Sequence, residues 1–146
     1  MNFLKSAIAA SALALSLASP ALAHDGVEIV DPYARFLPGG KSGAAFMIIE
    51  NHSSTDERLI SLTANVADRS ELHSEKTNAA GLMQMPLIDG GIFIPGHESH
   101  ALQRGGDHVM FLGLTRKVKD GDIVTLTLTF AHAGVVVVEV PVDNNR

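Results

Sequence analysis

Strict alternation of polar and apolar residues near the carboxyl end of the chain is the feature that most limits its fold. In Thr125-Leu-Thr-Leu-Thr-Phe130, an extended backbone would place the threonines on one side and the apolar residues on the other. Eight other segments have the length and apolar content of strands, and residues typical of turns separate them. They span residues 27–30, 43–50, 58–64, 70–76, 82–87, 98–102, 108–114 and 135–140. Short strands at this spacing are typical of a sandwich or barrel, so we expect an all-β protein.

Turn residues set the expected strand boundaries. Asp31-Pro32 should end the first strand. Lys119-Asp-Gly-Asp122 predicts a hairpin turn before the alternating strand, and residues 135–140 would complete the hairpin. The sequence shows no helical periodicity of useful length, no internal repeat and no linker.

The first 23 residues have the three parts of a secretory signal peptide. Lys5 supplies a positive charge, residues 7–17 form a short apolar core, and Ala21-Leu22-Ala23 is a small-residue cleavage site. We therefore expect export, cleavage after Ala23 and a single folded domain over residues 24–146. The apolar run is too short, and ends too quickly at Ser19-Pro20, for a membrane span; an uncleaved anchor is the alternative.

Composition excludes several classes of function. Without Lys5 the chain has ten basic and sixteen acidic residues, so nothing attracts nucleic acid, and no basic patch suggests a membrane surface. The chain contains no cysteine, which excludes thiolate chemistry and a blue-copper centre of the His₂Cys type. It also lacks the H-E-x-x-H, P-loop and G-x-G-x-x-G motifs. We therefore expect neither an enzyme nor a nucleic-acid partner, and no stable membrane insertion.

Metal-binding side chains gather between residues 73 and 110. This stretch holds four of the seven histidines and three of the four methionines that follow the initiator. Imidazole and thioether together suit a soft or borderline metal, and thioether suits Cu(I) in particular. His108 and Met110 are two residues apart, as are Met83 and Met85, and residues i and i+2 of a strand point to one face. Two short strands could thus each offer a pair of donors.

The order of these donors resembles that of the periplasmic copper chaperones of the PCu(A)C family. The resemblance rests on the pattern H…M-x-M…H-x-M and extends over most of the chain after the leader. The shared segments are Asp31-Pro-Tyr-Ala-Arg35, Gly43-Ala-Ala-Phe-Met-Ile-Ile-Glu-Asn51, Glu71-Leu-His73 and His108-Val-Met-Phe-Leu-Gly-Leu114. The resemblance implies a cupredoxin-like Greek-key β-sandwich in the periplasm that binds Cu(I) through His and Met. It also implies a copper-acceptor protein as partner, such as a subunit of cytochrome c oxidase that receives copper for its CuA centre.

Carried onto this sequence, the metal ligands of the family are His73, Met85, His108 and Met110. The gaps between them are eleven residues at 74–84 and twenty-two at 86–107, each one residue longer than in the family. Met83 would fit the two gaps less well, so it is left as a lining residue or a reserve ligand. The family often has methionine directly after the first histidine, where this chain has Ser74.

Other candidate donors are expected to be structural or exposed. Met47 lies within an apolar strand and should pack in the core. Four histidines lie in or near polar turns and are expected at the surface: His52, His97, His100 and His132. His24 would become the amino-terminal residue after cleavage, where its amine and imidazole could chelate Cu(II) as a secondary site. The alternative for His24 is a frayed terminus without function.

The resulting hypothesis is a periplasmic Cu(I) metallochaperone that delivers copper to cytochrome c oxidase. One alternative is a copper-dependent oxidase or monooxygenase built on His24, although the sequence identifies no second histidine for such a site. Two others are a copper storage or resistance protein and an interaction module with an incidental His/Met cluster. Oxidase turnover by the Cu(II) form would favour the enzyme, and failure to bind Cu(I) would favour the interaction module.

Overall fold

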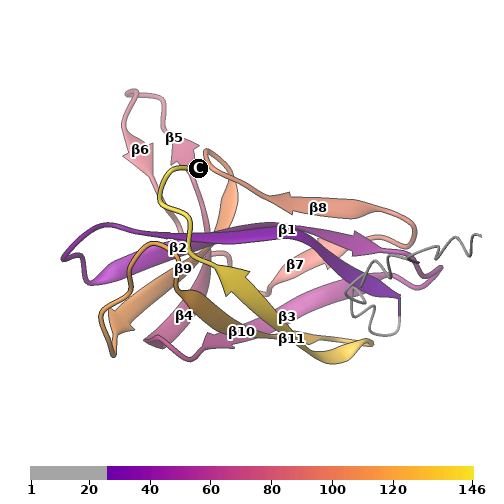
Figure 1. The fold of residues 1–146 in the computed structure, drawn as a ribbon. Coiled ribbons are helices and arrows are strands. Elements are labelled where there is room, and N and C mark those ends of the chain that lie inside the picture. Colours follow the sequence, from indigo (N-terminus) through magenta and orange to yellow (C-terminus); the bar gives the residue numbers. More distant parts are fainter. Residues whose placement is uncertain (1–25) are drawn as a thin grey trace, which may run out of the picture.

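Two antiparallel β-sheets packed face to face form the body of the protein (Figure 1). The computed structural model describes residues 26–146, so the predicted signal peptide over residues 1–23 and the candidate donor His24 lie outside the described residues. The strand order of the first sheet is β1 (Val27–Phe36), β2 (Ser42–Asn51), β9 (Asp107–Leu114) and β4 (Ala67–Ser74). The short strand β8 (Ser99–Leu102) also pairs with β2.

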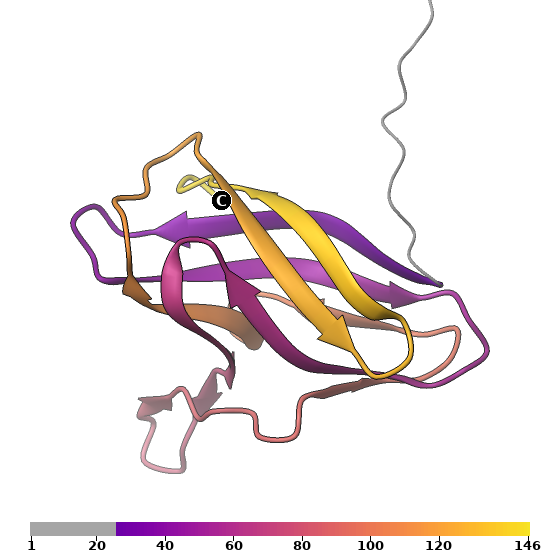
Figure 2. The same ribbon diagram turned by 90° about the horizontal axis from the view of Figure 1, so that it is seen from below.

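The second sheet has the strand order β11 (Gly134–Pro141), β10 (Ile123–Phe130), β3 (Glu57–Ala64) and β7 (Ile92–Ile94). A separate two-stranded pair is formed by β5 (Lys76–Thr77) and β6 (Met83–Gln84). In Figure 2, β10 and β11 run obliquely across β1 and β2, as expected when two twisted sheets stack. No helix among residues 26–146 is long and apolar enough to cross a membrane.

The apolar faces of the two sheets meet in one core. In β10 the four apolar residues from Val124 to Phe130 are buried, and the threonines that alternate with them lie on the other face. The same core contains Phe111 of β9, whose ring stacks on Phe36 of β1 with 5.5 Å between centroids. Met47 is also buried here, as predicted. The expectation of an all-β sandwich is thus confirmed.

The first strand is longer than the sequence predicts. Instead of ending at Asp31-Pro32, β1 continues through a β-bulge, where its pairing with β2 shifts between Val30 and Tyr33. Asp31 adopts a left-handed conformation there (φ 50°), and Pro32 is outside the ladder, so its missing N–H leaves no partner unsatisfied. Arg146 donates two hydrogen bonds to the Asp31 carboxylate, at 2.9 and 2.6 Å, which lower the pKa of that carboxyl.

The turn at 119–122 forms, but it is not the predicted hairpin. The N–H of Asp122 donates to the Lys119 carbonyl at 3.1 Å, yet the flanking strands β9 and β10 belong to different sheets. The hairpin is formed by β10 and β11, which pair along their whole length around residues 131–133. The sequence also did not predict β7, because a three-residue apolar segment carries no clear periodicity.

A buried carboxylate holds the turn between β10 and β11. Glu57 accepts hydrogen bonds from the backbone N–H groups of Arg58, His132 and Ala133 at 2.9, 2.9 and 2.8 Å. Burial alone would raise the pKa of Glu57, but these three bonds and the nearby His132 ring together lower it below its ordinary value. His132 itself is exposed, as predicted.

Candidate metal centre

The pairing of β4 with β9 places two histidines and a methionine on one face of the first sheet. His73 lies directly opposite His108, and Glu71 lies directly opposite Met110. Because alternate residues of a strand share a face, these four side chains point to the same side, whereas Val109 between them is buried in the core. The centroids of the His73 and His108 rings are 6.2 Å apart.

The remaining predicted ligand, Met85, comes from the segment that follows the β5–β6 hairpin. This hairpin projects from the two-sheet body in Figure 1, and the chain then returns along the edge of β4. The backbone N–H of Ser74 donates to the Pro86 carbonyl at 3.0 Å, and His73 forms an isolated bridge with Leu87. These contacts hold Met85 beside β4, where its carbonyl oxygen lies 3.0 Å from His73 Nδ1.

The tautomer of His108 follows from its surroundings. Its Nδ1 lies 3.0 Å from the backbone carbonyl of Gly106, an oxygen that can only accept a hydrogen bond. Nδ1 therefore carries the proton, and the neutral ring presents a lone pair on Nε2. His108 is only 5% exposed, and its ring lies 6.2 Å from that of Phe46. A backbone carbonyl that fixes ring and tautomer in this way is typical of a metal-binding histidine.

His73 has acceptors at both ring nitrogens. Its Nδ1 faces the Met85 carbonyl at 3.0 Å, and its Nε2 faces a Glu71 carboxylate oxygen at 2.9 Å. Satisfying both acceptors requires the doubly protonated ring, whereas metal binding requires a free lone pair. Glu71 therefore competes with a metal for His73. The sequence analysis did not single out Glu71, although its position two residues before His73 on one strand already predicts a shared face.

Three of the four predicted ligands line one hollow of about 600 Å³, which we call the donor hollow: Met85, His108 and Met110. Much of the remaining wall is apolar and comes from β1, β2 and the turn between them, including Phe36, Leu37 and Phe46. Two thioethers and an imidazole on a largely apolar wall form a soft donor set that suits Cu(I). His73 does not line this hollow but is the direct neighbour of His108.

The two methionines of the M-x-M pair take different positions. Met85 lines the donor hollow and is 45% exposed. Met83 lies on β6, is 61% exposed and is not among the residues that line the donor hollow. Of the two, Met85 is therefore the one that the fold brings to His108.

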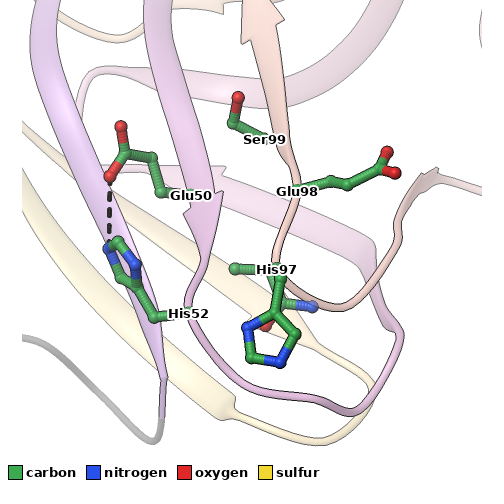
Figure 3. Close-up of a pocket in the computed structure, with 6 residues that line it drawn as sticks. Glu50, His52, His97, Glu98 and Ser99 are labelled. Carbon is green, nitrogen blue, oxygen red and sulfur yellow. Dashed lines mark ion pairs between the residues drawn. The ribbon is translucent and has the colours of Figure 1, made fainter.

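A second group of polar side chains lies at the other end of β2. Glu28 and Glu50 are cross-strand neighbours, and their carboxylates lie 3.0 and 3.2 Å from His52 Nε2. Figure 3 shows the His52–Glu50 pair, with His97 of the same hollow pointing away from it. Two carboxylates and an imidazole do not form a soft donor set for Cu(I), and the exposed His52 ring lies between the two carboxylates. His52 and His97 are at the surface, as predicted.

His100 departs from its expected place in a solvated turn. It lies on β8 and is only partly exposed. Its Nε2 pairs with an Asp107 carboxylate oxygen at 2.9 Å, so this ring links β8 to the start of β9.

Solved structures with a similar fold are PCuAC domains. The copper-bound PCuAC domain from PmoF2 has a TM-score of 0.68 and 23% identity, over 83% of this chain and 95% of that one. The Cu(I) form of DR1885 from Deinococcus radiodurans has a TM-score of 0.62 and 28% identity, over 80% of this chain and 79% of that one. Its apo form has a TM-score of 0.63 and 26% identity, over 99% and 97%. The cupredoxin-like sandwich implied by the resemblance is confirmed.

The fold thus defines the class of the protein, a β-domain with the fold of PCuAC domains. Within this class the chain belongs to the LpqE-like family, whose model, described as "Putative lipoprotein LpqE-like", matches residues 27–142. A curated relative is "Putative lipoprotein Lxx21020" of Leifsonia xyli subsp. xyli. It is 30% identical over 132 residues, which are 90% of this chain and 78% of that protein.

Proposed function

We propose that this protein is an exported Cu(I) carrier that holds the ion between Met85, Met110 and His108, with His73 as the fourth donor. The observation that carries the proposal is the meeting of two thioethers and the free Nε2 of His108 in one surface hollow. Two similar solved proteins, the PCuAC domain of PmoF2 and DR1885, are described with copper bound. The copper ion is the cargo here, and the chain performs no reaction on it.

The donor chemistry favours the reduced ion and permits its release. Thioether sulfur is a soft donor that suits Cu(I) and does not titrate near neutral pH. The imidazoles add affinity but must be neutral to bind. Because the hollow is open to the surface and Met85 is exposed, an acceptor can approach and replace one donor at a time.

His73 would join the site by exchanging its carboxylate partner for the metal. Its Nδ1 can keep the hydrogen bond to the Met85 carbonyl, which orients the ring. Its Nε2 would leave Glu71 and turn towards the ion beside His108. The Glu71 carboxylate would then remain close enough to offset part of the charge of the bound cation.

Export and the destination of the copper complete the proposal. Residues 1–23 would be the signal peptide and residues 24–146 the mature domain, and a family described as lipoprotein fits a place in the cell envelope. The resemblance to the PCu(A)C family supports cytochrome c oxidase as the acceptor and a periplasmic location. We infer a carrier rather than an oxidase because the donor set favours a single reduced ion.

A competition titration tests the proposal. Mature protein is mixed with Cu(I) and a chromophoric Cu(I) chelator, and the copper removed from the chelator is measured. One tightly bound Cu(I) per chain is expected. A protein that leaves all copper on the chelator would contradict the proposal and favour the interaction module.

A further inference from the structure

Two more hollows adjoin the donor hollow, and basic side chains surround all three. One shares Phe46, Met85 and His108 with the donor hollow, and the other shares Phe36 and Leu37 with it. The lysines and arginines that line the three hollows form what we call the basic rim. Its members are Arg35, Lys41, Arg104, Arg116, Lys117 and Lys119.

Basic residues are concentrated around the three hollows, whereas acidic residues predominate on the rest of the described surface. The basic rim contains six of the ten lysines and arginines of residues 26–146, and only two carboxylates, Glu75 and Asp122, line the same hollows. Two further carboxylates lie beside the hollows, Glu71 on β4 and Asp120, which accepts a hydrogen bond from the backbone N–H of Asn144 in the donor hollow. The other four cations share the remaining surface with eleven aspartates and glutamates. A protein with an overall charge of −5 therefore has more cations than carboxylates around its proposed copper site.

Most of the basic rim is free to meet a partner. Lys41, Lys117 and Lys119 are exposed, and within residues 26–146 no carboxylate forms an ion pair with any of them. Arg104 is also exposed, but its guanidinium donates a hydrogen bond to the backbone oxygen of Arg146 at 3.3 Å. Arg116 lies 3.5 Å from a carboxylate oxygen of Asp122, and the half-buried Arg35 donates to a backbone oxygen at 3.2 Å. The three lysines without internal partners would repel one another, and an acidic surface would relieve that repulsion.

Exposed apolar side chains lie inside the basic rim and beside it. Leu37, which lines the donor hollow, is 77% exposed, and Met85 is also exposed. Leu82, Met83 and Leu87 are exposed on and after the β5–β6 hairpin, next to Met85 in the chain. An apolar centre with a charged rim is the usual anatomy of a protein–protein interface.

We infer that the basic rim, with Leu37 and Met85 at its centre, is the docking surface for a copper acceptor that presents an acidic protein surface. This inference rests on the proposed function, because the acceptor is the partner that must reach the donors. A protein is favoured as the occupant because ligand exchange needs side-chain donors inside the donor hollow. The rim cations would mainly speed and orient encounter, and the apolar centre would hold the complex.

Site-specific photo-crosslinking tests this inference in cells that produce and export the full chain. A photoreactive residue replaces Leu37 in the docking surface or, as a control, the exposed Val137 on β11. Adducts are identified by mass spectrometry and quantified. Lys41→Glu and Lys117→Glu are then compared with Arg58→Glu, which makes the same change of charge on β3 of the other sheet.

The expected result is an adduct at position 37 with a protein whose surface is acidic, and a much weaker one at position 137. Lys41→Glu and Lys117→Glu should each lower its yield by ~3- to 10-fold, whereas Arg58→Glu should leave it unchanged. Equal labelling at positions 37 and 137, no adduct at position 37, or insensitivity to Lys41→Glu and Lys117→Glu would overturn the inference.

The same experiment separates this inference from the proposed destination. A charge-dependent adduct with an acidic protein other than an oxidase subunit supports the docking surface and removes cytochrome c oxidase as the acceptor. An adduct with an oxidase subunit whose yield does not depend on rim charge would support cytochrome c oxidase as the acceptor and contradict the proposed docking surface. Cu(I) binding itself is decided separately by the competition titration.

Discussion

His73 and His108 face each other across the antiparallel strands β4 and β9, with ring centroids 6.2 Å apart and ring planes 30° from parallel. The register of the sheet sets this distance, and a slip of one residue would turn one histidine into the core. Met110 is placed by the same strand as His108, whereas Met85 comes from an exposed segment. The proposed site thus has three donors on rigid strands and one on a segment that an acceptor can displace.

Met110→Leu should show whether Met110 is a metal ligand or only a packing residue. Leucine has a volume similar to methionine but no lone pair, so the fold should lose less than ~1.5 kcal/mol. Cu(I) affinity should fall by at least ~10-fold in a competition titration. Met47→Leu, in the buried core, is the matched control and should leave Cu(I) affinity unchanged. Equal affinities of wild type and Met110→Leu would remove Met110 from the site.

Met85→Leu and Met83→Leu should differ in the same titration. Met85 lines the donor hollow and Met83 does not, although they are two residues apart. Met85→Leu should therefore weaken Cu(I) binding by at least ~10-fold, and Met83→Leu should have no measurable effect. The reverse order of the two variants would show that Met83 is the ligand.

Glu57→Gln should destabilise the fold without affecting copper. An amide has one acceptor oxygen instead of two, so it loses at least one of the three backbone hydrogen bonds and turns an NH2 group towards a backbone N–H; the free energy of unfolding at pH 7 should therefore fall by about 1–3 kcal/mol. Because the folded pKa lies below the ordinary value of 4.5, the contribution of Glu57 is complete above pH 4.5 and is lost as pH falls through the lower folded pKa. Chemical denaturation at several pH values should show the difference from wild type shrinking below pH 4.5. A difference that grows with acidity would contradict this assignment.

Deletion of the protein should lower cytochrome c oxidase activity when copper is scarce. If the protein supplies copper to the CuA centre, activity should return when copper is added to the medium or when wild-type chain is restored. A chain that carries both Met85→Leu and Met110→Leu should fail to restore activity at low copper. Unchanged oxidase assembly in copper-starved deletion cells, with redundant carriers also removed, would count against this destination.

The sequence predicted the strands whose pattern is local. The alternating residues at 125–130 lie in β10, where the apolar ones form its buried face. His108 and Met110 share a face because the period of a strand is two. What the sequence could not predict depends on partners distant in the chain. The bulge that carries β1 past Pro32 exists because β2 continues to pair on its far side. The turn at 119–122 gave no information on whether its strands share a sheet.

For the candidate site, too, the sequence predicted what depends on local pattern but not what depends on tertiary contacts. The spacing along strands and the family resemblance predicted the donor set, and the gap lengths of the family pattern already favoured Met85 over Met83. The position of the segment after β6 beside His73 gives an independent reason for the same choice. The competition between Glu71 and a metal for His73 also needed tertiary geometry. The basic rim was not predicted, because its six members are dispersed between residues 35 and 119 and only folding gathers them.

X-ray absorption of the Cu(I)-loaded protein tests the central claim most directly, because it identifies the atoms bound to the metal. Thioethers from Met85 and Met110 and imidazoles from His73 and His108 should appear together as sulfur and nitrogen neighbours of one reduced copper ion. Met110→Leu should lower the sulfur contribution and keep the nitrogen contribution. A copper ion in the wild-type protein surrounded only by nitrogen and oxygen would contradict the assignment of the methionines and with it the proposed site.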